Sequence, residues 1–267
     1  MNGKNENALV PRLPSVVEKA GSGPKRILSG MVADTLALAK RQQLDPEQVN
    51  LLQDPEAQFQ MGMSFCYGKD LHQDYAEAAK FFRYAAERGH TSAQAYLGLC
   101  YEDGIGVSQD YTEAAKWYRK AAEQGDAWAQ AKLGYQYLFG EGVPKNYAEA
   151  AKWFLKAAKQ GNASAQTKLG CRYLFGEGVP KNYAEAAKWF LKAAEQGDVW
   201  AQTLLGHQYR DGLGVPKDEM EAHKWFKLAA EQGLKEAAEE LASLTSTLSA
   251  NEQEEGERRY QEFKALH

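Results

Sequence analysis

Residues 126–161 read DAWAQAKLGYQYLFGEGVPKNYAEAAKWFLKAAKQG, and residues 162–197 read NASAQTKLGCRYLFGEGVPKNYAEAAKWFLKAAEQG. The two stretches follow each other directly and are identical at 30 of 36 positions. A fixed period of a few tens of residues is typical of proteins that stack one repeated unit on the next. The sequence therefore predicts a repeat array rather than a single globular core.

The first part of the repeat has the pattern of an amphipathic helix. Asp126 is a suitable N-cap residue for this helix. Its apolar face carries, at spacings of four residues, Ala129, Leu133 and Tyr137. Gly134 lies beside this face, and the lack of a Cβ atom there lets a neighbouring helix approach closely.

A turn and a second helix complete the repeat. Residues 140–144, GEGVP, end the first helix, because the glycines permit positive φ and the proline cannot continue a helical ladder. Asn146 followed by Glu149 matches the capping-box pattern and predicts the start of the second helix. Gly161 takes the left-handed position after that helix, whose apolar stripe is formed by Ala150, Trp153, Phe154 and Ala157. We expect a repeating helix–turn–helix.

The same spacing continues on both sides of these copies. Each repeat ends in a glycine, at Gly89, Gly125, Gly161, Gly197 and Gly233. Tryptophan recurs in the second helix at Trp117, Trp153, Trp189 and Trp225, with Phe81 in the first copy. Five units of 36 residues follow, with the bounds 54–89, 90–125, 126–161, 162–197 and 198–233. In the first unit Asp70 and Leu71 replace the second glycine and the valine, so we expect an irregular turn there.

Both ends of such an array expose an apolar face that a cap must cover. Residues 234–267 are expected to form a C-terminal helical cap, whose last helix begins after Ser249 and carries Tyr260 and Phe263. Residues 25–53 are expected to form an N-terminal helical cap, and residues 1–24 a flexible segment. An alternative for the apolar residues near 27–38 is a helix that binds a membrane or a partner.

The combined pattern, Leu-Gly-x-x-Tyr-x-x-Gly-x-Gly-Val, then Asp/Asn-Tyr-x-x-Ala-x-x-Trp-Phe/Tyr and Ala-Ala-x-x-Gly, resembles the Sel1-like repeat family, a relative of the tetratricopeptide repeats. The resemblance covers residues 54–233. It implies an all-α fold, a right-handed α/α superhelical solenoid of five 36-residue helix–turn–helix repeats with helical caps. It also implies that the first helices line a concave binding surface. The pattern is specific for the fold and says little about function.

Composition argues against several function classes. The formal net charge is −4, and Lys and Arg alternate with Glu, so we expect no nucleic acid as a partner. The N-terminus is polar and contains Pro11 and Pro14, which is unlike a secretory signal. No apolar run approaches the roughly 20 residues of a membrane-spanning helix. We therefore expect a cytoplasmic protein without membrane insertion.

We predict no catalytic residue, no cofactor and no metal site. The three cysteines, Cys66, Cys100 and Cys171, lack paired spacing, and the five histidines lack the spacing of metal ligands. The Gly-x-Gly turns join helix to helix and recur in four units, which is typical of structural turns rather than phosphate-binding loops.

Units three and four differ mainly on the first helix, at five of their six differing positions. A row at i, i+3, i+7 and i+10 on that helix changes while the framework repeats, and its aromatic and charged residues are typical of binding hot spots. We predict a partner-binding groove formed by Trp128, Tyr135, Leu138, Cys171, Arg172, Leu174, Trp200, Thr203, His207 and Arg210. The alternative is that these side chains pack between consecutive first helices and drifted after duplication.

The leading hypothesis is a non-enzymatic scaffold or adaptor that holds an unidentified protein or peptide in this groove. A second hypothesis is an enzyme, because a cysteine-rich branch of the resembled family has been labelled β-lactam-binding or β-lactam-hydrolysing. This sequence departs from that branch at its disulfide-forming positions, which hold Ala122 and Gln130, Ala158 and Gln166, and Ala194 and Gln202. A third hypothesis is a self-assembling or regulatory module, a homo-oligomer included, in which the N-terminal segment is the interacting part.

Overall fold

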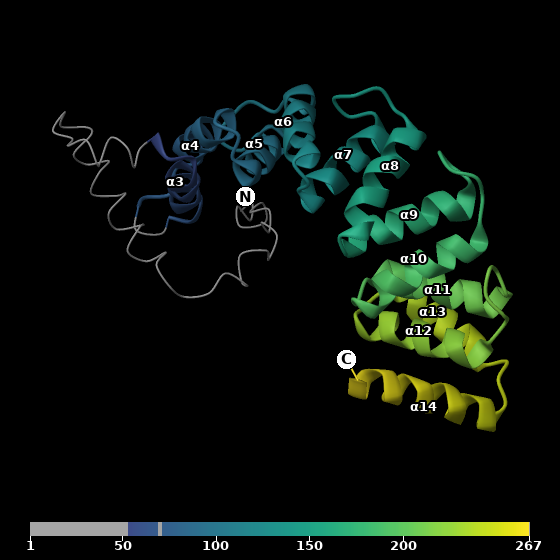
Figure 1. Cartoon of the computed structure of the whole chain (residues 1–267). Helices are drawn as coiled ribbons and strands as arrows, with labels where there is room; N and C mark the ends of the chain where they lie inside the picture. Colours follow the sequence, from purple (N-terminus) through teal and green to yellow (C-terminus); the bar gives the residue numbers. More distant parts are fainter. Residues whose placement is uncertain (1–52, 69–70, 267) are drawn as a thin grey trace, which may run out of the picture.

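The computed structural model describes residues 53–68 and 71–266 as helices joined by short turns. One helix pair falls in each of the five predicted units, and the all-α solenoid is confirmed. The pairs stack along an open arc, with α3, α5 and α7 on its inner side (Figure 1). They are α3 (Pro55–Tyr67) and α4 (Tyr75–Glu87), α5 (Thr91–Asp103) and α6 (Tyr111–Glu123), α7 (Ala127–Phe139) and α8 (Tyr147–Lys159), α9 (Ala163–Phe175) and α10 (Tyr183–Glu195), and α11 (Val199–Asp211) and α12 (Glu219–Glu231).

The predicted helix starts are confirmed, but the capping box is only half formed. Asp126 accepts a hydrogen bond from the Ala129 N–H at 2.7 Å, and Asn146 accepts one from the Glu149 N–H at 3.0 Å. The reciprocal bond of this capping box, from the Asn146 N–H to the Glu149 side chain, does not form. The Asn146 N–H donates instead to the Tyr137 carbonyl at 2.8 Å, and Glu149 pairs with Lys152 at 2.5 Å. The turn thus brings the carbonyl of Tyr137, in the preceding helix, to the N–H that the glutamate would otherwise accept from.

Gly134 has the packing role that its position predicts. A Cβ atom there would lie 2.7 Å from the ring of Phe154, which belongs to the second helix of the same unit. Phe154 is fully buried, as is its equivalent in every unit. The close contact between glycine and aromatic ring therefore fixes the distance between the two helices of each pair.

The tryptophan of each second helix joins one unit to the one before. Trp117 is buried among residues of the first unit such as Phe82, and Trp153 among residues of the second unit such as Tyr118. Trp225 packs in the same way on the fourth unit. Large aromatic surfaces buried at each junction make the stability of one unit depend on its neighbour.

Buried glutamines form a polar ladder across the same junctions. The Gln130 amide donates to the Ala122 carbonyl at 3.0 Å, and its oxygen accepts from Gln160 at 2.8 Å. The equivalent donor bonds to the preceding unit come from Gln94, Gln166 and Gln202. Each glutamine side chain thus donates a hydrogen bond to a backbone carbonyl near the end of the preceding second helix, which has no partner within its own helix.

Replacing Gln166 with alanine is expected to destabilise the chain by about 1–3 kcal/mol, because the carbonyl of buried Ala158, which accepts from it at 3.1 Å, loses this partner. The bond from the Gln196 amide at 2.7 Å is lost as well, although that amide also donates to the Lys192 carbonyl. Urea denaturation followed by circular dichroism measures the change. The control is Gln261→Ala, since Gln261 is exposed on the last helix. Equal midpoints for the two variants would contradict this role of the ladder.

The C-terminal cap consists of α13 (Lys235–Thr245) and α14 (Ala250–Leu266). The last helix begins after Ser249, as predicted, with a complete capping box. The Ser249 N–H donates to Glu252 at 2.8 Å, and the Glu252 N–H donates back to the Ser249 hydroxyl at 3.5 Å. Tyr260 is fully buried, and Phe263 packs edge-on against Trp225 at 5.1 Å. The prediction that these two rings cover the end of the array is confirmed.

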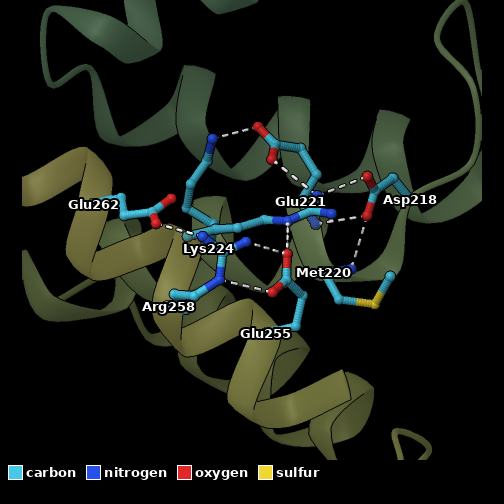
Figure 2. A network of polar contacts seen from close by, with 8 residues as sticks. Asp218, Met220, Glu221, Lys224, Glu255, Arg258 and Glu262 are labelled. Carbon is cyan, nitrogen blue, oxygen red and sulfur yellow. Dashed lines mark hydrogen bonds and ion pairs between the residues drawn. The ribbon is translucent and has the colours of Figure 1, made fainter. Parts of the chain in front are cut away.

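Charged residues hold this cap on the last repeat. Asp218 caps α12 through the Glu221 N–H and also accepts from Arg259 of α14 at 2.7 Å. Arg259 in turn bonds Glu255 at 2.8 Å. Figure 2 shows Asp218, Glu221 and Glu255 in this network. Burial is the largest single influence on the pKa of Asp218 and acts to raise it. The hydrogen bond and charge of Arg259 and the backbone N–H groups of Glu221 and Met220 together outweigh burial and hold the pKa below its usual range. The network thus links a helix cap to the terminal helix.

The predicted N-terminal segment 1–24 and nearly all of the predicted cap 25–53 lie outside the described residues, as does Asp70 in the first turn. Across the part of the chain that the structure describes, no helix is long and apolar enough to cross a membrane.

Candidate functional site

The solvent-facing row of the first helices is rotated slightly from the predicted one. On α7 one row of half-buried or exposed side chains consists of Trp128, Lys132, Tyr135 and Phe139. Their spacing is i, i+4, i+7 and i+11, which keeps all four within about 40° of Trp128 around the helix. Positions i+3 and i+10 lie about 60–80° to one side, where the neighbouring helices cover them.

Three of the predicted groove residues are buried. Leu138 is 8% exposed and belongs to the core of units three and four. Arg172, also 8% exposed, pairs with Glu177 at 2.5 Å and lies over the ring of Tyr147. Thr203 is buried and bonds the carbonyl of Val199. Leu174 is half-buried and packs against the core that contains Phe190 and Leu205.

The other predicted residues reach solvent on consecutive first helices. We call the following set the first-helix surface: Trp128, Lys132, Tyr135 and Phe139 of α7, Ser164, Lys168, Cys171 and Phe175 of α9, and Trp200, Leu204 and His207 of α11. Arg210 is half-buried at the end of α11.

Sequence reasoning missed Phe139 and Phe175, which are among the most exposed large side chains at 61% and 62%. Both are phenylalanine, so a search for positions that differ between units three and four passes over them. The sequence did indicate their exposure, because an aromatic residue directly before the Gly-x-Gly turn lies outside the apolar stripe that packs the two helices of a pair. With Trp200, which is 57% exposed, they place large apolar side chains on three consecutive first helices.

The aromatic residues of α7 support one another. The Trp128 ring meets Tyr118 edge-on at 5.6 Å and lies 6.4 Å from Tyr96 of the preceding first helix. Tyr135 stacks on Phe139 at 6.2 Å. The hydroxyls of Tyr135 and Ser164 lie 2.7 Å apart, joining α7 to α9. The alternative prediction was that these side chains pack between consecutive first helices. The contacts of Trp128 with Tyr96 and of Tyr135 with Ser164 fit that alternative.

At the α11 end of the first-helix surface lie an ion-paired arginine, Arg210, and a histidine, His207. Arg210 pairs with Glu240 of α13 at 2.5 Å and with Asp211 at 2.8 Å. His207 packs edge-on against Phe226 at 5.1 Å. Burial lowers the pKa of His207 and outweighs the opposing effect of Glu240, so the ring is held toward its neutral form.

The thiols are held in their protonated form. Burial raises the pKa of Cys66 to about 11 and that of Cys100 to about 12. Burial also raises the pKa of Cys171, against the opposing charges of Lys168 and Arg172. A thiol with a raised pKa is a poor nucleophile at neutral pH and acts mainly as a small apolar group.

Comparison with known proteins places these helices in one family. The Sel1 repeat model matches residues 55–90, 91–126, 129–162, 163–198 and 201–234. No curated protein matches the chain.

Two solved structures are similar over most of the chain. A Sel1 repeat protein from Oxalobacter formigenes has a TM-score of 0.70 at 32% identity, covering 87% of this chain and 96% of that one. A protective antigen of uropathogenic Escherichia coli with an SLR fold has a TM-score of 0.71 at 37% identity, covering 80% of this chain. This chain spans only 43% of the length of that antigen.

Proposed function

Because this chain belongs to the Sel1 repeat family, we propose that it is a protein-binding scaffold that holds a segment of a partner polypeptide on its first-helix surface. The observation that carries the proposal is the exposure of Phe139, Phe175 and Trp200 on consecutive helices. Apolar side chains of this size are normally buried, and a run of them on one side of a solenoid is typical of a binding surface.

The support around these side chains favours a preformed site. Tyr135 is fixed by its stacking on Phe139 and its hydrogen bond to Ser164, so it does not have to be ordered when a partner binds. Rigid aromatic anchors lose little conformational entropy on binding, which raises affinity. Phe139 and Phe175 lie at the C-terminal ends of α7 and α9 and Trp200 lies near the N-terminal end of α11, so a segment that contacts all three rings has to cross the helices obliquely.

The glutamine ladder favours this proposal over β-lactam chemistry. The positions at which the cysteine-rich branch places disulfides are occupied by hydrogen-bonded pairs, such as Gln130 with Ala122 and Gln166 with Ala158. The raised pKa of Cys171 also disfavours a thiolate nucleophile on the first-helix surface. A cytoplasmic location is part of the same proposal.

Affinity capture from the native lysate followed by mass spectrometry tests the proposal. We expect the Phe175→Ala, Trp200→Ala double variant to bind the captured partner roughly thirtyfold more weakly or worse, because truncating one central anchor typically costs about 2 kcal/mol or more. The matched control is Tyr84→Ala with Tyr111→Ala, since these tyrosines are exposed on second helices. A partner that the first double variant retains and the control loses would overturn the proposal.

A further inference from the structure

Pairs of side chains bridge consecutive first helices at a constant separation of 30 residues. Lys132 of α7 pairs with Glu102 of α5 at 2.7 Å, and Glu102 also accepts from the Tyr118 hydroxyl at 2.5 Å. At the other end of the array, Arg210 pairs with Glu240 at 2.5 Å. Each cation in these pairs therefore has its carboxylate within the chain.

The next pair along the array breaks this pattern. Lys168 of α9 is equivalent to Lys132, but the position of Glu102 is taken by Leu138 and that of Tyr118 by Phe154. Both replacements are apolar and buried. The Lys168 ammonium lies 5.6 Å from the centre of the Tyr135 ring. Within residues 53–68 and 71–266, no carboxylate forms an ion pair with it.

The repeat that follows shows that the position does not require a cation. The equivalent pair there is Leu174 with Leu204, which is apolar on both sides. The framework therefore tolerates leucine where Lys168 stands, and within the described residues the charge has the ring of Tyr135 beside it but no carboxylate. Lys168 lies on the same helix as Phe175, between the helices that carry Phe139 and Trp200.

A partner that covers the exposed rings would also remove water from this half-buried ammonium. Burying a charge without a counter-charge is strongly unfavourable, so a tightly bound partner has to provide a counter-charge. Resting on the proposed function, we propose that Lys168 binds a carboxylate of the partner polypeptide and selects segments in which that carboxylate is flanked by apolar anchors. Segments without it would leave the charge unpaired and be rejected.

Peptide selection tests this inference with a defined probe. A phage-displayed library of random twelve-residue peptides is selected on the full chain, and the enriched peptides are synthesised for titration. We expect an Asp or Glu next to aromatic or aliphatic residues. Lys168→Glu should weaken these peptides roughly tenfold or more, and selection on that variant should enrich Lys or Arg instead. Amidated and free C-termini distinguish a side-chain carboxylate from a terminal one.

Matched variants separate the charge from the fold. Lys168→Arg should keep the acidic preference, and Lys188→Gln, which removes an exposed lysine paired with Glu185, should bind as the wild type does. Circular dichroism confirms that each variant is folded. Peptides that bind Lys168→Glu and the wild type equally, yet lose binding to Phe175→Ala with Trp200→Ala, would overturn this inference and leave the proposed function standing. If no selected peptide depends on the two rings, both fail.

Discussion

Replacing Gly142 with alanine is expected to destabilise the solenoid by roughly 2–5 kcal/mol. The residue has a φ of 69°, and a Cβ atom there would lie 1.9 Å from the carbonyl oxygen of Tyr111. A left-handed conformation costs an alanine about 1–2 kcal/mol, and overpacking typically adds about 1–3 kcal/mol. The atom that is met belongs to the backbone at the start of α6, so it cannot rotate away. Urea denaturation followed by circular dichroism measures the loss.

Gly161 provides the matched control for this prediction. Its φ is 90°, which is also left-handed, but a Cβ atom there would meet nothing within 4 Å. Gly161→Ala should therefore cost only the conformational part, about 1–2 kcal/mol. If the two variants lose the same stability, the turn of one repeat does not rest on the second helix of the preceding repeat as described.

Replacing Phe154 with alanine is expected to cost about 3–5 kcal/mol, as is typical of large cavities in a well-packed core. Phe154 is fully buried, contacts Gly134 and meets Tyr135 edge-on at 5.2 Å. Because repeats are stable only through their neighbours, the loss in the third unit should weaken the units on both sides. Thermal and urea unfolding of the full chain measure the effect.

Phe175→Ala is the control for the same chemical change at an exposed position. Its stability should stay within about 0.5 kcal/mol of the wild type, since little apolar contact is lost. A large loss on Phe175→Ala would show that this ring belongs to the core, which would remove an anchor from the first-helix surface. The pair of variants therefore distinguishes residues that hold the fold from residues that are available to a partner.

The framework was predictable because each of its determinants is local and is repeated. The Gly140–Pro144 turn, the Asn146 cap and the Gly134 contact follow from a few neighbouring residues, and five copies in register reinforce the same pattern. The failure of the Glu149 half of the capping box has a non-local cause. The carbonyl of Tyr137 competes for the Asn146 N–H, and only the path of the turn brings it there.

The candidate site was only partly predictable. Comparing equivalent positions of the repeats identified Trp128, Tyr135 and Trp200 as candidates. It could not identify Phe139 or Phe175, because units three and four both have phenylalanine there. The difference between rows i+3 and i+4 is about 100° of rotation, and tertiary packing decides which of them is covered. The isolation of Lys168 depends on residues 30 positions away, so it became visible only once the helices were paired in space.

Site-specific photo-crosslinking in the native lysate tests the central claim most directly. A benzophenone-bearing amino acid is placed at residue 139 or 175 on the first helices, and at residue 84 on α4 as the control, because Phe139, Phe175 and Tyr84 are all exposed. The account predicts one polypeptide adduct of the same mass from residues 139 and 175 and none from residue 84. An adduct from residue 84 alone, or none from either first-helix position, would contradict it.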